Sequence, residues 1–313
     1  MWFRNLIVYR LPSGWLADAD GFESKLAQHP LQPCGGFEME SRGWIAPREG
    51  GTFLYRSHRQ WLLALGVERK LLPRSIVRQQ AKERADRIAQ RQGHPVGRKQ
   101  MRDLVDKVAS ELMPRALAHR RVTHGWVDSD NGWLMVDAAA DAGAEQFLET
   151  LRRADEKIPA VRLEMQRSPA GAMADWLARG EAPGAFDIDQ DLELRSPDAS
   201  KATVRYTRHH LEGKEIRDHL AAGKTVVRLG LTWNDRISFV LTENLQVKRL
   251  VFLDILKRES DSEVQDEAEQ FEIDFALMTG EVSKMLTDMV KALGGEKAGR
   301  KASRAPTEEV TDE

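Results

Sequence analysis

Apolar positions along the chain follow two different periods, which predicts a protein of mixed helices and strands. Short apolar runs with two-residue alternation, bounded by Gly, Pro, Asn or Asp, predict strands. These are expected at 5–10, 43–46, 52–55, 60–67, 122–127, 133–137, 161–166, 202–207, 224–233, 236–242 and 246–256. Helical spacing predicts helices at 20–28, 74–92, 98–112, 142–154, 169–179, 213–222 and 261–293. The pattern indicates the α+β class, with antiparallel sheets and packed helices.

The order of these elements divides the chain. Residues 1–73 and 119–180 predict an α/β body, in which the Gly-Trp pairs of "RGWIAP" and "HGWVDS" suggest a diverged repeat. Residues 181–294 predict a second α+β region, with an acidic surface turn at 180–200, an antiparallel meander and a long acidic C-terminal helix. The tail at 295–313 is rich in Gly, Ala and charge, and is expected to be disordered.

Residues 74–118 predict a basic helical hairpin that projects from this body. The first helix follows Pro73, carries six basic and two acidic residues, and ends at Gly93. Its apolar stripe is narrow and poor in large side chains, with members Val77, Ala81, Ala85 and Ile88. Because only one thin face can be buried, the element is expected to extend away from the rest of the chain.

Charge is segregated along the sequence although the net charge of the 313 residues is only −2. Residues 69–121 hold 15 Lys/Arg and 5 Asp/Glu, a net +10, and residues 201–258 hold 12 and 6, a net +6. Residues 259–313 hold 6 and 15, a net −9. Two basic zones predict a polyanionic partner. The candidate phosphate-binding residues are Arg205, Arg208, His209, Lys224, Arg228, Arg78, Lys82, Arg98, Lys99 and Arg115.

Two simpler interpretations of these cations stay open. The first basic zone could be a solvated helix face, and the arginines of the second could pair with the acidic C-terminal helix.

Lys224 and Arg228 lie four apart on a predicted strand, so they are expected to share one face. The sequence contains no helix-turn-helix, zinc-finger or RNA-recognition signature. DNA binding through these residues would therefore contact the backbone without reading bases and depend steeply on salt.

Motifs for catalysis or cofactor binding fail on inspection, so an enzyme is not expected. "AAGKT" lacks the first glycine of a phosphate-binding loop, since Asp218 stands there, and Gly223 instead predicts a helix C-cap before a strand. "DIDQDLEL" lacks the glycine and glutamate of a calcium loop. His209 and His210 are adjacent and have no nearby ligand set. No catalytic residue, metal or cofactor is predicted.

The compartment is indicated by the lone Cys34, which excludes an internal disulfide and fits a reducing cytoplasm. No signal peptide or membrane span is recognised, so no membrane partner is expected.

Ten stretches in register carry a resemblance over residues 1–296. They are "MWFRNLIVYRL", "PCGGFEM", "GWIAP", "LLPRSIVRQ", "LMPRAL", "NGWLMVDAA", "AGKTVVRLGLTWNDRISFVL", "VKRLVFLDIL", "EIDFALMTGE" and "ALGGE". In order and spacing they resemble the bacterial recombination-associated RdgC family.

The resemblance implies a ring-shaped homodimer that encircles double-stranded DNA without sequence preference, restrains RecA-promoted strand exchange and associates with the nucleoid. It makes the hairpin at 74–118 the arm that closes the ring. It places Leu117 at the dimer contact, where the family carries an aromatic residue. It also places Arg208 and His209 in a DNA-contacting loop, where the family carries Lys-Gln. The alternatives are a protein-binding adaptor that uses the acidic helix and, less favoured, a metal-dependent nuclease.

Overall fold

The chain folds into two compact units in a computed structural model that describes residues 2–11, 19–156, 158–211, 213–253 and 266–297. The first unit comprises Leu11–Ala160, and the second comprises Met1–Arg10 with Val161–Glu313. The predicted boundary at 180 therefore differs from the observed one. The difference arises because helix α5 (Pro169–Arg179) packs on strand β10 (Thr225–Trp233), which belongs to the second unit.

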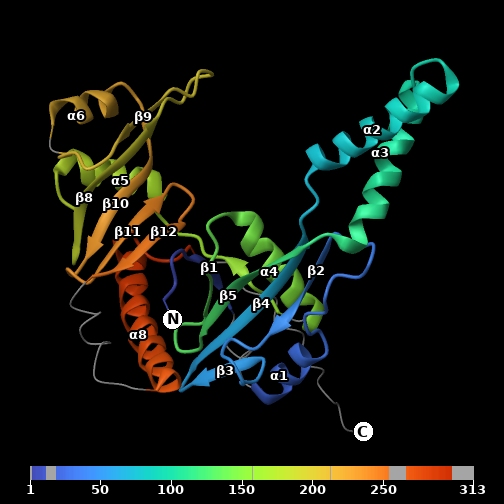
Figure 1. The fold of residues 1–313 in the computed structure, drawn as a ribbon. Coiled ribbons are helices and arrows are strands. Elements are labelled where there is room, and N and C mark those ends of the chain that lie inside the picture. Colours follow the sequence, from blue (N-terminus) through green and yellow to red (C-terminus); the bar gives the residue numbers. More distant parts are fainter. Residues whose placement is uncertain (1, 12–18, 157, 212, 254–265, 298–313) are drawn as a thin grey trace, which may run out of the picture. The chain divides into compact units, whose positions relative to one another are not determined.

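The first unit is built on an antiparallel sheet (Figure 1). Its strands run in the order β2 (Glu40–Ile45), β4 (Gln60–Lys70), β5 (Ala118–Asp128) and β6 (Trp133–Val136), and β3 (Leu54–Ser57) pairs with β4. Helices α1 (Ala19–Ala27) and α4 (Asp141–Ala154) complete it. Phe147 of α4 packs edge-on against Trp44 with ring centroids 5.3 Å apart, so the amphipathic face of α4 joins the core.

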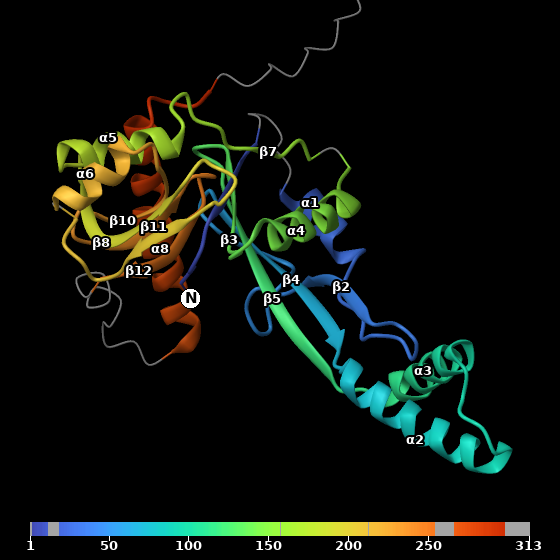
Figure 2. The same ribbon diagram turned by 90° about the horizontal axis from the view of Figure 1, so that it is seen from above.

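Two helices join β4 to β5 and pack against each other (Figure 2). They are α2 (Arg74–Gln92) and α3 (Arg98–Leu112), and the bounds match those predicted. Val77, Ala81 and Val108 are buried between them. Arg84 donates to Glu111 across the pair at 2.7 Å, and this hydrogen bond lowers the pKa of Glu111. A 3-10 turn (Met113–Arg115) leads from α3 toward β5.

The second unit contains a five-stranded antiparallel sheet. The strands run in the order β12 (Val247–Phe252), β11 (Ile237–Thr242), β10, β8 (Phe186–Arg195) and β9 (Thr203–Tyr206), so the meander prediction is confirmed. Helices α5, α6 (Lys214–Ala221) and α8 (Glu267–Ala292) belong to the same unit. Strands β1 (Ile7–Arg10) and β7 (Val161–Arg162) pair antiparallel. Residues 254–265 and 298–313 lie outside the described residues, and with them the end of the predicted strand at 246–256, the start of the predicted C-terminal helix at 261–293 and most of the predicted tail.

The acidic turn predicted at 180–200 is wrong for its central part. Residues 186–195 form strand β8, which pairs with both β9 and β10. Asp187, Asp189, Asp191 and Glu193 recur at every second position, which is the period of a strand. Their charge suggested a turn because strands are poor in acidic residues. Here cross-strand arginines compensate two of the carboxylates, Asp191 and Glu193.

Two further predictions can be compared with the backbone. Gly223 adopts a left-handed conformation with φ of 81° between α6 and β10, which confirms the predicted helix end. Within the described part of the chain, no helix is both long and apolar enough to cross a membrane.

Candidate nucleic-acid interface

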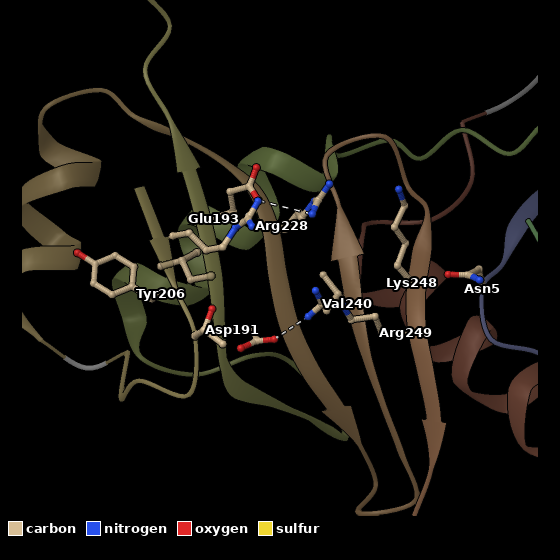
Figure 3. A pocket seen from close by; sticks show the side chains of 11 residues that line it. Asn5, Asp191, Glu193, Tyr206, Arg228, Val240, Lys248 and Arg249 are labelled. Atoms are coloured by element: carbon tan, nitrogen blue, oxygen red, sulfur yellow. Dashed lines mark hydrogen bonds and ion pairs between the residues drawn. The ribbon is translucent and has the colours of Figure 1, made fainter. Parts of the chain in front are cut away.

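One face of the five-stranded sheet is polar and hollowed by a pocket of about 190 Å³ (Figure 3). Buried Leu229, Leu231 and Trp233 point to the other face of β10. Four cationic residues line the pocket together with two carboxylates and Tyr206. The charged residues are Arg205, Arg228, Lys248, Arg249, Asp191 and Glu193. The pocket therefore has a surplus of two positive charges and can receive an anionic group.

Arg205 and Arg228 both lie beside Glu193. Nη2 of Arg205 lies 2.7 Å from Glu193 Oε2, and Nη1 of Arg228 lies 3.6 Å from the same oxygen. Within the described ranges both arginines pair with Glu193 on β8, and no pair with α8, the described part of the acidic C-terminal helix, is found. Both guanidinium groups remain partly exposed, with 63% and 42% side-chain exposure.

Arg208 and His209 lie in the loop that follows β9. The backbone N–H of Arg208 donates to Asp191 Oδ1 at 3.3 Å, and that of His209 donates to the Gln190 carbonyl at 3.2 Å. These bonds fix the loop beside the pocket. Both side chains are exposed, and no partner of the Arg208 guanidinium is found among the described residues. Burial, with a smaller contribution from Glu215, raises the pKa of neighbouring Tyr206, so its hydroxyl stays protonated at neutral pH.

Lys224 does not share the face of Arg228, contrary to the prediction. The pairing of β10 with β8 shifts register between Val226 and Arg228. Such an irregularity inserts a residue and breaks the two-residue alternation. Lys224 is half-buried, with its Nζ 3.0 Å from Nδ1 of His219 on α6, and it does not line the pocket.

The predicted cations of the first unit are spread along the α2–α3 pair. All five side chains are exposed, and no ion pair or hydrogen bond of theirs is found in the described ranges: Arg78, Lys82, Arg98, Lys99 and Arg115. Neither α2 nor α3 has an acidic residue in its first turn. Cations in the first turn of α3 oppose the helix dipole. An external anion near that turn would offset this repulsion.

Leu117 is 78% exposed in the segment between the 3-10 turn and β5. Its carbonyl accepts from the backbone N–H of Leu71 at 2.7 Å, and Leu71 is also exposed. Two large apolar side chains thus lie side by side in solvent at the base of the α2–α3 pair. Neighbouring exposed apolar groups are typical of surfaces that a partner covers.

Sequence reasoning missed Lys248, Arg249 and the role of Glu193. The alternation of "QVKRLVF" places Lys248 and Leu250 at positions of one parity and Arg249 at the other, so the pattern separates the two cations. The backbone overrides this expectation, because Arg249 has a positive φ of 52° beside a register shift in β11–β12 pairing. Both residues therefore reach the pocket. Only the period-two acidic pattern of β8 could have indicated acidic partners for arginines on adjacent strands.

The described ranges contain no group of side chains typical of a metal-binding site. Three or more His, Cys, Asp or Glu side chains do not gather there into a group that could hold a metal ion. The ring nitrogen Nδ1 of His209 lies 2.8 Å from the His210 carbonyl. Asp191 and Glu193 are engaged by arginines.

Fold and site together define an α+β protein with cationic residues on one sheet face and along a helix pair. A family model described as "Putative exonuclease, RdgC" matches residues 1–296. The chain is 48% identical over 299 residues to the recombination-associated protein RdgC of Dechloromonas aromatica, covering 95% of this chain and 98% of that one. The corresponding protein of Herminiimonas arsenicoxydans is 47% identical over 298 residues, with coverage of 95% and 99%. The chain therefore belongs to the RdgC family, whose curated members are named recombination-associated proteins.

Proposed function

We propose that this protein binds double-stranded DNA without sequence preference, encircles it as a homodimeric ring, and thereby restrains RecA-promoted strand exchange at the nucleoid without cleaving the DNA. The observation that carries the proposal is the pocketed cationic face of the second unit, in a chain of a recombination-associated family. The exposed cations of the α2–α3 pair support it. No metal ion or cofactor enters the proposed mechanism.

The absence of sequence preference follows from how the cations are distributed. The candidate contacts come from strands, a loop and helix flanks, and the recognition helix or ribbon that reads base edges is not among them. Guanidinium and ammonium groups in such an arrangement neutralise phosphates. Each neutralised phosphate releases counterions, so affinity depends on salt with a slope of about −0.9 per contact.

Closure of the ring is assigned to Leu117 and the helix pair. The exposed Leu71 and Leu117 are expected to bury their side chains against a second copy of the chain, because no intramolecular neighbour covers them to a large extent. Leu117→Asp should therefore shift the protein from dimer to monomer in sedimentation analysis. Val161→Asp is a matched control, since Val161 is also an exposed apolar residue, with 65% exposure.

The test compares binding, retention and cleavage. Two unrelated duplexes of equal length should give equal affinities by fluorescence anisotropy, with a loss of about 10³-fold or more between 50 and 200 mM salt. A closed ring should remain on nicked circular DNA after a salt challenge and slide off linear DNA. The same protein should slow RecA strand exchange. A strong sequence preference, or equal retention on circles and linear DNA, would refute the proposal.

A nuclease is the second candidate, favoured only by the wording of the family description. End-labelled linear duplex and supercoiled plasmid should stay intact after long incubation with Mg²⁺ or Mn²⁺. Progressive loss of end label that depends on protein concentration would establish an exonuclease instead.

A further inference from the structure

Three neighbouring strands place two arginines on either side of one glutamate. Glu193 of β8 is paired in register with Arg205 of β9 and with Arg228 of β10. Residues directly opposite each other in antiparallel strands have their side chains on the same face. The sheet register itself therefore builds an Arg–Glu–Arg row on the polar face.

The contacts within this row point the anion inward and the cations outward. Oε2 of Glu193 accepts from Nε and Nη2 of Arg205 at 3.1 and 2.7 Å, and the glutamate side chain is only 9% exposed. A guanidinium has five N–H donors in a fixed fork. Arg205 uses one edge of its fork on Glu193 and also lines the pocket, so its other donors remain available to a ligand there.

A second pair extends the row into a pocket. Arg249 of β12 donates to Asp191 Oδ2 at 3.2 Å, and Asp191 also accepts from the backbone N–H of Arg208. Gly230 lies between them on β10, where an added Cβ would lie 3.2 Å from the Cβ of Asp191. The absence of a side chain at Gly230 therefore lets Asp191 approach β10 closely. Figure 3 shows Arg228 and Arg249 held at their respective carboxylates around the pocket.

We propose that this pocket is a subsite for one phosphate group of the DNA backbone, and that Glu193 is a positioning residue that holds Arg205 and Arg228 in the orientation the phosphate requires. The inference rests on the proposed function. Arginine forks bind phosphate through two parallel N–H bonds, which demand a fixed plane. A buried carboxylate behind two arginines supplies that plane and limits their rotamers before DNA arrives.

If Glu193 positions the arginines, neutralising it changes the DNA affinity in the direction opposite to the one that charge alone predicts. Glu193→Gln removes one negative charge from a DNA-facing surface, so a charge effect alone strengthens DNA binding. If Glu193 orients the arginines, the same variant weakens binding. Asp187→Asn is the matched control, because Asp187 is an exposed carboxylate on the same strand with no ion pair among the described residues.

The experiment measures anisotropy of a labelled 30-base-pair duplex with the full-length protein across a salt series. We expect Glu193→Gln to weaken binding about tenfold, as for a lost charge-assisted hydrogen bond, while Asp187→Asn leaves it equal or tighter. Arg205→Lys keeps the charge at an exposed position and should also weaken binding, since lysine lacks the fork. Because lysine keeps the positive charge, the salt slope of Arg205→Lys should stay close to that of the wild-type protein. Glu193→Gln should add no loss to an Arg205→Ala/Arg228→Ala double variant.

Each other outcome overturns the inference. The positioning role of Glu193 would be contradicted by tighter DNA binding of Glu193→Gln, by full affinity of Arg205→Lys, or by additive losses in the combined variant. In each of these cases the wild-type protein still binds DNA, so the proposed function stands. No binding by the wild-type protein would overturn both. Inorganic phosphate should show no saturable binding to the free protein. Saturable binding abolished by Arg205→Lys would assign the pocket to free phosphate instead.

Discussion

The α2–α3 pair should unfold locally when its small core is weakened, while the sheet of the first unit stays folded. Val108 is fully buried, and the cluster contains only Val77 and Ala81 as further buried residues. Val108→Ala removes two methyl groups, at about 0.8 kcal/mol each, and leaves a cavity, for a total of about 2 kcal/mol. A difference of this size increases the population of the open pair by roughly 30-fold.

Hydrogen–deuterium exchange with mass spectrometry measures this directly. Peptides from α2 and α3 should exchange roughly 30-fold faster in Val108→Ala, and peptides from β4 and β5 should be unchanged. Ser110→Ala is the control, because Ser110 is exposed on the same helix. Equal acceleration in β4 and β5 would refute the reasoning, since the pair would then share its stability with the sheet. Unchanged exchange in α2 and α3 would refute it too, because the buried cluster would not hold the pair together. In retention assays, Val108→Ala should lose circular DNA faster than Ser110→Ala.

Three predictions concern stability in the first unit. Burial lowers the pKa of His124 to about 4, so as the pH falls the unfolded state takes up a proton at this residue before the folded state does. About 2 kcal/mol of the free energy of unfolding should therefore be lost between pH 7 and 5. Urea denaturation should show a smaller loss for His124→Gln. Asp128 is fully buried and accepts from the backbone N–H groups of Asp130 and Asn131 at 3.1 Å, so Asp128→Ala should cost about 3 kcal/mol in urea denaturation, and a loss below 0.5 kcal/mol would contradict this. An added Cβ at Gly125 would lie 2.2 Å from the Phe147 ring; Gly125→Ala should therefore lower Tm, and adding Phe147→Leu should partly restore it.

Local signals were sufficient to predict several elements with accurate ends. Pro73 sets the start of α2, and Gly93 ends it in a left-handed conformation with φ of 77°. Helix α3 follows Gly97 and begins at Arg98, as predicted. These boundaries depend on backbone conformations that one or two residue types favour. Strand β8 was missed because its acidic composition outweighed its alternation, and its stability depends on arginines supplied by other strands.

Composition and periodicity determined the α+β class, the helix pair and the segregation of charge, and the quoted stretches indicated the family. Those properties depend on neighbours within a few residues, so they can be read along the chain. Tertiary structure alone decided which cations act together. The β8–β9 and β8–β10 registers place Arg205 and Arg228 around Glu193, a register shift removes Lys224 from that face, and a positive φ turns Arg249 toward Asp191. Register is set by long-range pairing, and a one-residue shift reverses every side chain beyond it.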